Sequence, residues 1–140
     1  MTDYLVDNSV WARAIAGNPR MIARLRRIER APADLVVTCP PQVLEFCHSA
    51  RTPAEHARYR EQMSLGFPLE RAPGEALVLD IQAALWKAGL VRAAGAVDIL
   101  IAGYAIANDA TVLAADHDFG HIARVCDLQH EYVAPETGAC

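Results

Sequence analysis

Short apolar runs alternate with helical patterns along this chain, and this alternation is the feature that most constrains its fold. Residues 4–6, 35–39, 111–115 and 130–133 are short apolar runs of the kind that form strands. Longer segments with helical spacing lie between most of them. Strands that alternate with helices predict a parallel sheet covered on both faces. We therefore expect an α/β fold, a single-domain three-layer α/β/α sandwich with a mostly parallel central sheet.

Capping residues mark where the helices should begin and end. We expect Ser9 to cap the first helix and Gly17 to follow its end, and we expect Asn18 to cap the next helix. Thr52 and Glu55 have the spacing of a capping box at the start of a later helix. The segment 97–108 is mostly apolar and should be a buried central helix. The other expected helices span 9–16, 18–30, 40–50, 52–66 and 75–90, with a short helical turn over 119–126.

The length and composition predict one compact domain. A chain of 140 residues with 53% hydrophobic residues can bury a substantial core. We expect the domain to cover residues 1–134, followed by a flexible tail over 135–140. No segment approaches the ~20 apolar residues of a membrane span, and no secretory leader is visible. Four cysteines without a C-x-x-C pair favour reduced thiols, so we expect a cytoplasmic protein without membrane contact.

Acidic residues recur where strands should end and helices should begin. Asp7 closes the first strand, and Asp116 and Asp118 follow the strand over 111–115. Asp98 lies at the start of the apolar helix, and Glu45 lies about a turn and a half into the helix after the second strand. Because ligands bind at the carboxyl ends of parallel strands, we expect one edge of the sheet to bring these carboxylates together.

Each carboxylate also has an ordinary structural interpretation. Asp7 can cap the helix that follows it, and Asp98 can favour the positive end of its own helix. Asp116 and Asp118 can be turn residues. Glu45 can point away from the apolar face of its helix into solvent. Taken singly, these interpretations are the commoner ones, and only the joint placement of the residues favours a site.

A cluster of carboxylates needs positive charge. Two carboxylates ~4 Å apart repel by ~1 kcal/mol in water and ~4 kcal/mol near a protein surface. The neighbouring residues are mainly apolar, so a divalent cation is the natural partner. Mg²⁺ and Mn²⁺ prefer oxygen ligands, and two such ions can activate a water and stabilise the leaving oxygen of a phosphodiester. The carboxylates therefore predict a metal site suited to phosphodiester hydrolysis.

Four short motifs follow one another along this chain: YLVDNSVW, QVLEFC, GAVDILIAGYA and LAADHDFGHIA. In their order and spacing they resemble the motifs of the PIN-domain nucleases. The resemblance extends from Tyr4 to about Val133, and the compact length is similar to that of the VapC toxins of bacterial toxin–antitoxin pairs. Alanines stand where leucine and threonine are often seen before the last acidic pair, which leaves the acidic residues intact.

The resemblance implies a PIN-like fold and a specific activity. That activity is Mg²⁺- or Mn²⁺-dependent endoribonuclease cleavage by a metal-activated water, as the toxin of a type II toxin–antitoxin system. The implied partners are an RNA substrate, a cognate VapB-like antitoxin and a second copy of the chain in a homodimer. The alternative is a catalytically inactive PIN-like protein-interaction module.

The same resemblance assigns roles to individual positions. Ser9 supports the site, although a plain N-cap is an equally good interpretation, and Arg92 positions phosphate. The implied metal ligands are Asp7, Glu45, Asp98, Asp116 and Asp118, of which the first four are also implied to be catalytic.

The charge distribution bears on how RNA could bind. The formal net charge of −4 argues against a nucleic-acid partner, but removing the five carboxylates leaves +1. Six arginines lie between residues 13 and 30. Arg20, Arg24 and Arg27 share one side of a predicted helix, where they form either a phosphate-binding stripe or a solvated face.

The tryptophans and two histidines have ordinary interpretations beside functional ones. We expect Trp11 and Trp86 to pack in the core, although Trp11 is also a candidate for stacking on a base. His117 and His121 are interpreted as surface histidines, since an H-x-x-x-H spacing alone is weak support for a transition-metal site. A receiver domain needs an acid where Asn8 stands, and an Asp-x-Asp phosphatase needs one where Ser9 stands. Both classes are therefore disfavoured.

Overall fold

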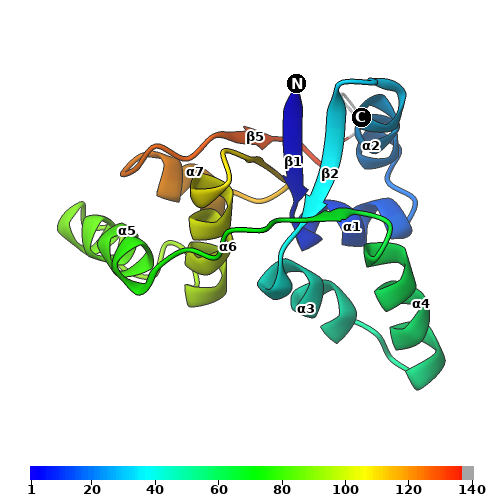
Figure 1. Cartoon of the computed structure of the whole chain (residues 1–140), viewed down its shortest axis with the longest axis horizontal. Coiled ribbons are helices and arrows are strands. Elements are labelled where there is room, and N and C mark those ends of the chain that lie inside the picture. Colours follow the sequence, from blue (N-terminus) through cyan, green and yellow to red (C-terminus); the bar gives the residue numbers. More distant parts are fainter. Residues whose placement is uncertain (137–140) are drawn as a thin grey trace.

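A five-stranded, wholly parallel sheet forms the centre of the computed structural model, which describes residues 1–136 (Figure 1). The α/β class is confirmed, and the sheet is parallel throughout rather than mostly so. The short strand at residues 67–68 was not predicted, because two residues give no periodic signal. The strands are β1 (Thr2–Val6), β2 (Asp34–Thr38), β3 (Phe67–Pro68), β4 (Thr111–Ala114) and β5 (His130–Tyr132).

Helices connect the strands at nearly the predicted positions. Pro19, Pro40 and Pro53 each begin a helix, where the missing proline N–H costs nothing. Asn18 and Thr52 cap two of these helices through their side chains, as expected. The helices are α1 (Asn8–Ile15), α2 (Pro19–Arg30), α3 (Pro40–His48), α4 (Pro53–Met63), α5 (Glu75–Lys87), α6 (Ala96–Ala107) and α7 (Asp118–Ala123).

The first helix begins one residue earlier than predicted. Asp7, with extended backbone angles, is the N-cap of α1, and its Oδ2 accepts a hydrogen bond from the Ser9 N–H at 3.0 Å. The prediction that Ser9 caps this helix is therefore wrong. A carboxylate at the end of a strand can accept from the N2 amide as well as a hydroxyl can, so Asp7 takes the capping position. Ser9 lies inside the first turn.

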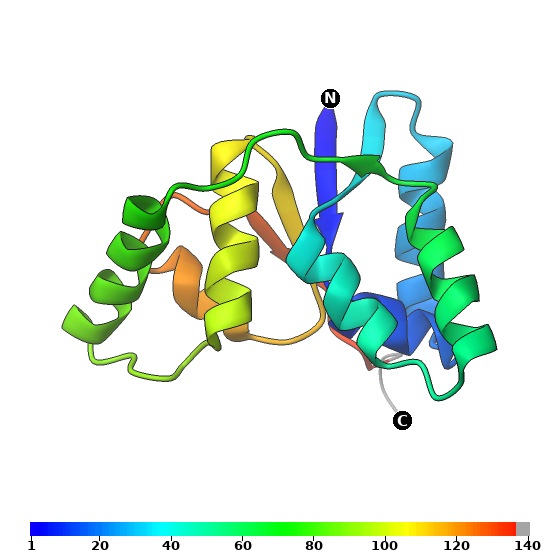
Figure 2. The ribbon, with the colours of Figure 1, turned by 60° about the horizontal axis from the view of Figure 1, so that its bottom comes forward.

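The sheet is covered on both faces, which confirms the three-layer sandwich (Figure 2). Successive residues of a strand point to opposite faces. Leu5 packs with α5, α6 and α7, whereas Val6 packs with α1 and α2. The central helix was correctly predicted, since Ile101 and Ala102 of α6 are fully buried. Helices α3 and α4 form a third packing unit around Phe46, which Trp11 contacts edge-on.

The strand order β3-β2-β1-β4-β5 places a switch point in the middle of the sheet. From β1 the chain builds β2 and β3 on one side, then returns to add β4 and β5 on the other. Val6 pairs with Leu113, and the Asp7 N–H donates to the Leu113 carbonyl at 2.8 Å. In open α/β sheets the crevice at such a point, beyond the carboxyl ends of the strands, is where ligands bind. Asp7 lies in that position.

Arg24 is not part of a phosphate-binding stripe. Its guanidinium donates to both carboxylate oxygens of Glu131, at 2.6 and 3.0 Å, and lies 4.9 Å from the ring centre of Tyr4. Residue 24 lies three positions after Met21 and four before Ile28, so it shares their buried face and is only 8% exposed. The predicted stripe therefore loses its middle member, while Arg20 and Arg27 remain exposed.

Trp86 also differs from its prediction. It is 46% exposed on α5, whereas Leu85 beside it is fully buried. The apolar residues of this helix surround more than one face, so the sequence did not show which side meets the core. Trp11 is partly buried against Phe46, as expected.

The remaining global features concern the cysteines, the tail and the membrane. Cys39, Cys47 and Cys126 are free thiols in the described chain, and Cys140 lies outside it. Of the expected tail, residues 137–140 lie outside the described residues, and the Pro135 carbonyl accepts a hydrogen bond from the Asn18 side chain at 2.6 Å. Within residues 1–136, none of the helices has the length and apolar character needed to span a bilayer.

Candidate metal centre

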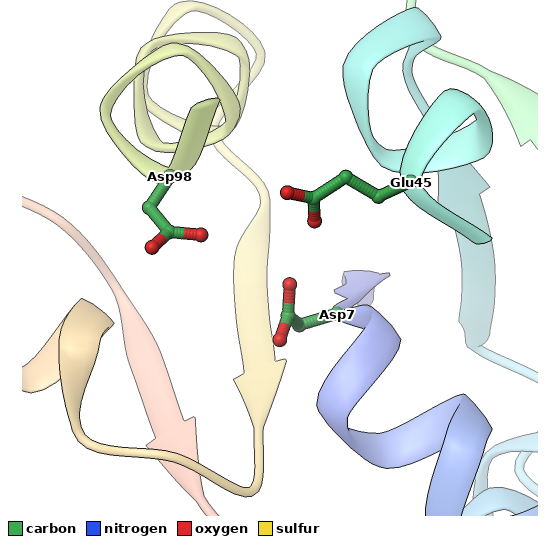
Figure 3. Close-up of side chains that lie close together, drawn as sticks. All are labelled: Asp7, Glu45 and Asp98. Atoms are coloured by element: carbon green, nitrogen blue, oxygen red, sulfur yellow. The ribbon is translucent and has the colours of Figure 1, made fainter. Parts of the chain in front are cut away.

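Three carboxylates from distant parts of the sequence converge beyond the carboxyl edge of the sheet (Figure 3). Asp7 comes from the junction of β1 and α1, Glu45 from α3 and Asp98 from the first turn of α6. One oxygen from each lies within 4.8 Å of the other two. Their side chains point toward a common space, so the sequence prediction that these three acids meet is confirmed.

Asp7 is the most constrained member of this group. It is only 4% exposed, and its Oδ2 already accepts the helix-capping bond from Ser9. Its other oxygen, Oδ1, is buried and has no hydrogen-bond partner among the described residues. A buried carboxylate oxygen without a hydrogen-bond donor is costly. A cation or a hydrogen-bond donor bound at Asp7 Oδ1 would therefore stabilise the site.

Glu45 lies toward the site rather than in solvent. Helix α3 contacts both α1 and α6, and this packing brings Glu45 beside Asp7 and Asp98. Partial burial, followed by the charges of Asp7 and Asp116, raises the pKa of Glu45. The interpretation of Glu45 as a solvent-facing residue of its helix is therefore wrong.

Asp98 is the carboxylate whose ionisation the site disfavours most clearly. Burial, a side-chain hydrogen bond with Asp118, and the charges of Asp7, Asp118 and Glu45 raise the pKa of Asp98 to about 8. Without a cation, these surroundings favour the protonated form of the Asp98 carboxyl group. Asp98 Oδ2 also accepts a hydrogen bond from the Gly95 N–H at 3.4 Å. Asp98 therefore has its predicted structural role at the start of α6 as well as its place in the acidic group.

Asp116 and Asp118 lie at the same edge, just outside the close group of three. Asp116 Oδ1 accepts from the Asp118 N–H at 3.2 Å, so Asp116 does act as a turn residue. Burial and the charges of Asp7 and Asp118 raise its pKa. Asp118 is also close enough to Asp98 to help raise the pKa of the Asp98 carboxyl group. The structure thus brings all five predicted acids to one edge, with three in the tightest arrangement.

Ser9 links two parts of this edge. Its hydroxyl oxygen accepts a hydrogen bond from the Ala115 N–H at 2.9 Å. Asp7 lies two residues before Ser9, and Asp116 directly follows Ala115. The bond therefore fixes the start of α1 against the loop that contains Asp116.

Two arginines bear on this site, one predicted from the sequence and one not. Arg92 is exposed in the loop before α6, with a left-handed backbone (φ 61°), and its predicted phosphate role is untested by this arrangement. Arg13, which sequence reasoning did not single out, donates from Nη1 to the Ser9 carbonyl at 2.8 Å. Its charge partly offsets the rise in the Asp116 pKa. The available signal was its position four residues after Ser9 on the same helix face.

A groove of about 770 Å³ opens beside Glu45, between α3 and α6. It is mostly apolar, and Leu44 on its rim is 69% exposed. Glu45 is the acidic group in its wall, so the groove leads to the carboxylate cluster. The residues lining the groove are Asn8, Pro41, Leu44, Glu45, His48, Ser49, Val97 and Leu100.

The residues present fit a divalent cation of the Mg²⁺ or Mn²⁺ type. With Mg²⁺–oxygen distances of about 2.1 Å, ligand oxygens on opposite sides of the ion are about 4.2 Å apart. The oxygens here are separated by at most 4.8 Å, so small side-chain movements suffice to close around such an ion. The donor set is entirely carboxylate oxygen, which favours hard cations over zinc or copper. The unpartnered Asp7 Oδ1 supports the same fit.

Comparison with known protein families agrees with this geometry. A profile of the PIN domain matches residues 4–125, which is most of the chain. The chain belongs to the PIN domain family. A search of curated protein sequences gave no significant match.

Solved structures show the same PIN fold. VapBC2 from Rickettsia felis, bound to a DNA fragment from its promoter, has a TM-score of 0.74 at 17% identity, over 94% of this chain and 99% of that one. VapBC-1 from nontypeable Haemophilus influenzae gives 0.69 at 22% identity, covering 94% and 98%. VapBC-5 from Mycobacterium tuberculosis gives 0.67 at 18% identity, covering 95% and 100%. At these identities the similarity establishes the PIN fold alone.

Proposed function

We propose that this PIN domain is a metal-dependent endoribonuclease of the VapC type. The observation that supports it most is the buried, unpartnered Oδ1 of Asp7, which faces two further carboxylates at the switch point of the sheet. A protein-interaction surface alone gives no reason to bury these acids together, because their mutual repulsion destabilises the fold. A divalent cation bound among these acids would offset their repulsion and would support phosphodiester hydrolysis.

In this proposal Asp7, Glu45 and Asp98 are the metal ligands, with Asp116 and Asp118 completing the acidic edge. When bound, Mg²⁺ or Mn²⁺ activates a water for attack on the phosphodiester and stabilises the leaving oxygen. Asp98 must be deprotonated to serve as a ligand, although burial and the neighbouring acids raise its pKa. Asp116 uses Oδ1 to accept from the Asp118 N–H, so its other carboxylate oxygen can accept a proton from a neighbouring water.

Two residues position other groups in this scheme. Ser9 fixes the loop before Asp116 against α1 through the Ala115 amide. Arg13, anchored to the Ser9 carbonyl through Nη1, retains N–H donors on Nε and Nη2 that can contact an RNA phosphate. Arg92 is proposed as a second phosphate contact from the loop before α6.

We also propose a VapB-like antitoxin as the partner of this chain and a homodimer as its assembly. The structural relatives are described as VapBC complexes, some of them bound to DNA. In this arrangement the chain is the toxin of a type II pair, and RNA cleavage is the toxic activity. Co-expression with the antitoxin should relieve growth inhibition.

The nuclease proposal is tested by cleavage of a labelled single-stranded RNA by the purified protein. We expect cleavage with Mg²⁺ or Mn²⁺, its loss in EDTA and its return when excess metal is added. Asp7→Asn and Asp98→Asn should each reduce the rate at least ~100-fold, since each removes one charged ligand oxygen. Asp80→Asn is the matched control, because Asp80 is an exposed acid on α5.

The alternative is an inactive PIN-like interaction module. If Asp7→Asn and Asp98→Asn proteins fold normally and inhibit growth as strongly as the wild type, then nuclease chemistry is not the activity. If only the Asp80→Asn control retains inhibition, the nuclease proposal is supported.

A further inference from the structure

We propose that the stacked rings of His117 and Tyr132 form a platform for an unpaired RNA base beside the carboxylate cluster. This inference rests on the nuclease function proposed above. In this arrangement His117 and Tyr132 position the substrate, and cleavage requires an unpaired base next to the cleaved phosphate.

The two rings are arranged as a stack. Their centroids are 4.5 Å apart and their planes differ by 22°. His117 is an exposed residue, and Tyr132 is 39% exposed. Each ring uses one face in the pair, so an additional planar group can stack on an outer face.

The pair lies at the same sheet edge as the acids. His117 stands between Asp116 and Asp118 in the chain. Tyr132 pairs in register with Ala114, the last residue of β4, and helix α7 contacts β5. A base stacked here therefore has its own sugar–phosphate chain beside Asp116. This is the relation that a nuclease needs between a bound base and the phosphate it cuts.

In the part of the chain that the structure describes, neither side chain has a clear structural role. The His117 side chain makes no capping hydrogen bond to α7, although the residue occupies the N-cap position. Val133, the residue directly after β5, packs against the core, while Tyr132 remains on the surface. An exposed aromatic pair next to a phosphodiester site is suited to base stacking.

The chemistry of stacking also defines the ligand. Every nucleobase has a π face, so a stacking platform tolerates different bases but requires them to be unpaired. Removing a stacking aromatic side chain typically weakens binding by roughly 5- to 150-fold per base. We therefore expect the platform to determine preference for single-stranded RNA and the position of the cut, more than the identity of the base.

Cleavage kinetics on a short single-stranded RNA test this proposal. Tyr132→Ala and His117→Ala should each raise KM about tenfold with little change in kcat. Tyr132→Phe should restore the wild-type KM, because it keeps the ring. His56→Ala is the matched control, since His56 is an exposed histidine on α4. His117→Ala keeps the test available if Tyr132→Ala fails to fold.

A second arm replaces the nucleotides of the substrate, one at a time, with abasic residues. For the wild type, loss of the base at one position near the cut should raise KM about tenfold, and Tyr132→Ala should be insensitive at that position. Equal KM values for the wild type, Tyr132→Ala and His117→Ala would overturn the platform while leaving the nuclease proposal intact. A wild-type protein that neither binds nor cleaves RNA would overturn both.

Discussion

The hydroxyl oxygen of Ser9 accepts a hydrogen bond from the N–H of Ala115 at 2.9 Å, and the bond joins the start of α1 to the end of β4. The two bonded residues lie 106 positions apart in the sequence. The acids on either side of the bond, Asp7 and Asp116, lie at the same edge of the sheet, so their relative position depends on this contact.

Ser9→Ala should weaken both stability and activity. Ala115 is buried, and its N–H would lose its partner, which should lower the free energy of unfolding by ~1–3 kcal/mol. Loss of the positioning contact should reduce kcat about tenfold with a smaller change in KM. Ser9→Thr, which keeps the hydroxyl, should behave like the wild type in thermal unfolding and RNA cleavage. A fully stable and active Ser9→Ala protein would contradict this role.

The metal-free protein should become less stable as the pH rises. The pKa of Asp98 is raised from an ordinary value of 3.8 to about 8 by burial, by Asp118 and by neighbouring charges. Between these values the folded state binds more protons than the unfolded state, so the free energy of unfolding falls with increasing pH. The raised pKa values of Glu45 and Asp116 act in the same direction. Denaturant titrations in EDTA from pH 5 to pH 8 measure this dependence.

Asp98→Asn is the control for that pH dependence. The amide cannot ionise, so the fall in stability over the same range should be clearly smaller. Added Mn²⁺ should stabilise the wild type more at pH 8 than at pH 5, because the ligands must be deprotonated to bind it. A wild-type protein whose stability rises with pH in EDTA would contradict the assigned cause.

Arg24 should contribute to stability rather than to RNA binding. Arg24→Met removes both bonds to Glu131 and the contact with Tyr4, which should lower the free energy of unfolding by ~1–3 kcal/mol after allowing for the partial exposure of Glu131. Its KM for RNA should stay near the wild-type value. Arg27→Ala, an exposed change on the same helix, should leave stability nearly unchanged. An Arg24→Met protein of normal stability with a raised KM would restore the phosphate-binding interpretation.

Gly103→Ala should destabilise the protein although alanine favours helices. A Cβ at this position would lie 2.8 Å from Val78 Cγ1 and 3.0 Å from Pro73 Cβ. The resulting overpacking should cost ~1–3 kcal/mol, which exceeds the gain of ~1 kcal/mol from helix propensity. Gly120→Ala is the control, because its nearest neighbour would be His130 at 3.6 Å. Chemical denaturation of both variants distinguishes crowding from propensity, and a stabilised Gly103→Ala would contradict the close packing.

Local sequence patterns predicted most of the fold because strands and helices have different periodicities. The capping residues Asn18 and Thr52 and the apolar run of α6 gave reliable element positions. Strand β3 was missed because two residues are too few to show an alternating apolar pattern. Its pairing with β2 is set by the tertiary fold rather than by local sequence. The burial of Arg24 was missed because its partner, Glu131, lies 107 residues away.

The candidate site was predicted to the level of which acids share an edge. Parallel topology alone brings Asp7, Asp98 and Asp116 to the same side of the sheet. Which oxygens approach most closely was not predictable, because this depends on how α3 packs against α6. That packing turns Glu45 into the cluster and leaves Asp116 outside the closest three. The stacking of His117 on Tyr132 was likewise not predictable, because it depends on the pairing register of β4 and β5.

The most direct test of the metal centre is anomalous diffraction from crystals grown with Mn²⁺. We predict a manganese peak bonded to oxygens of Asp7, Glu45 and Asp98 at ~2.0–2.3 Å in the wild type, and no such peak in Asp7→Asn crystals. A protein that cleaves RNA with Mn²⁺ while its manganese lies elsewhere, with Asp7 Oδ1 still unligated, would contradict the account.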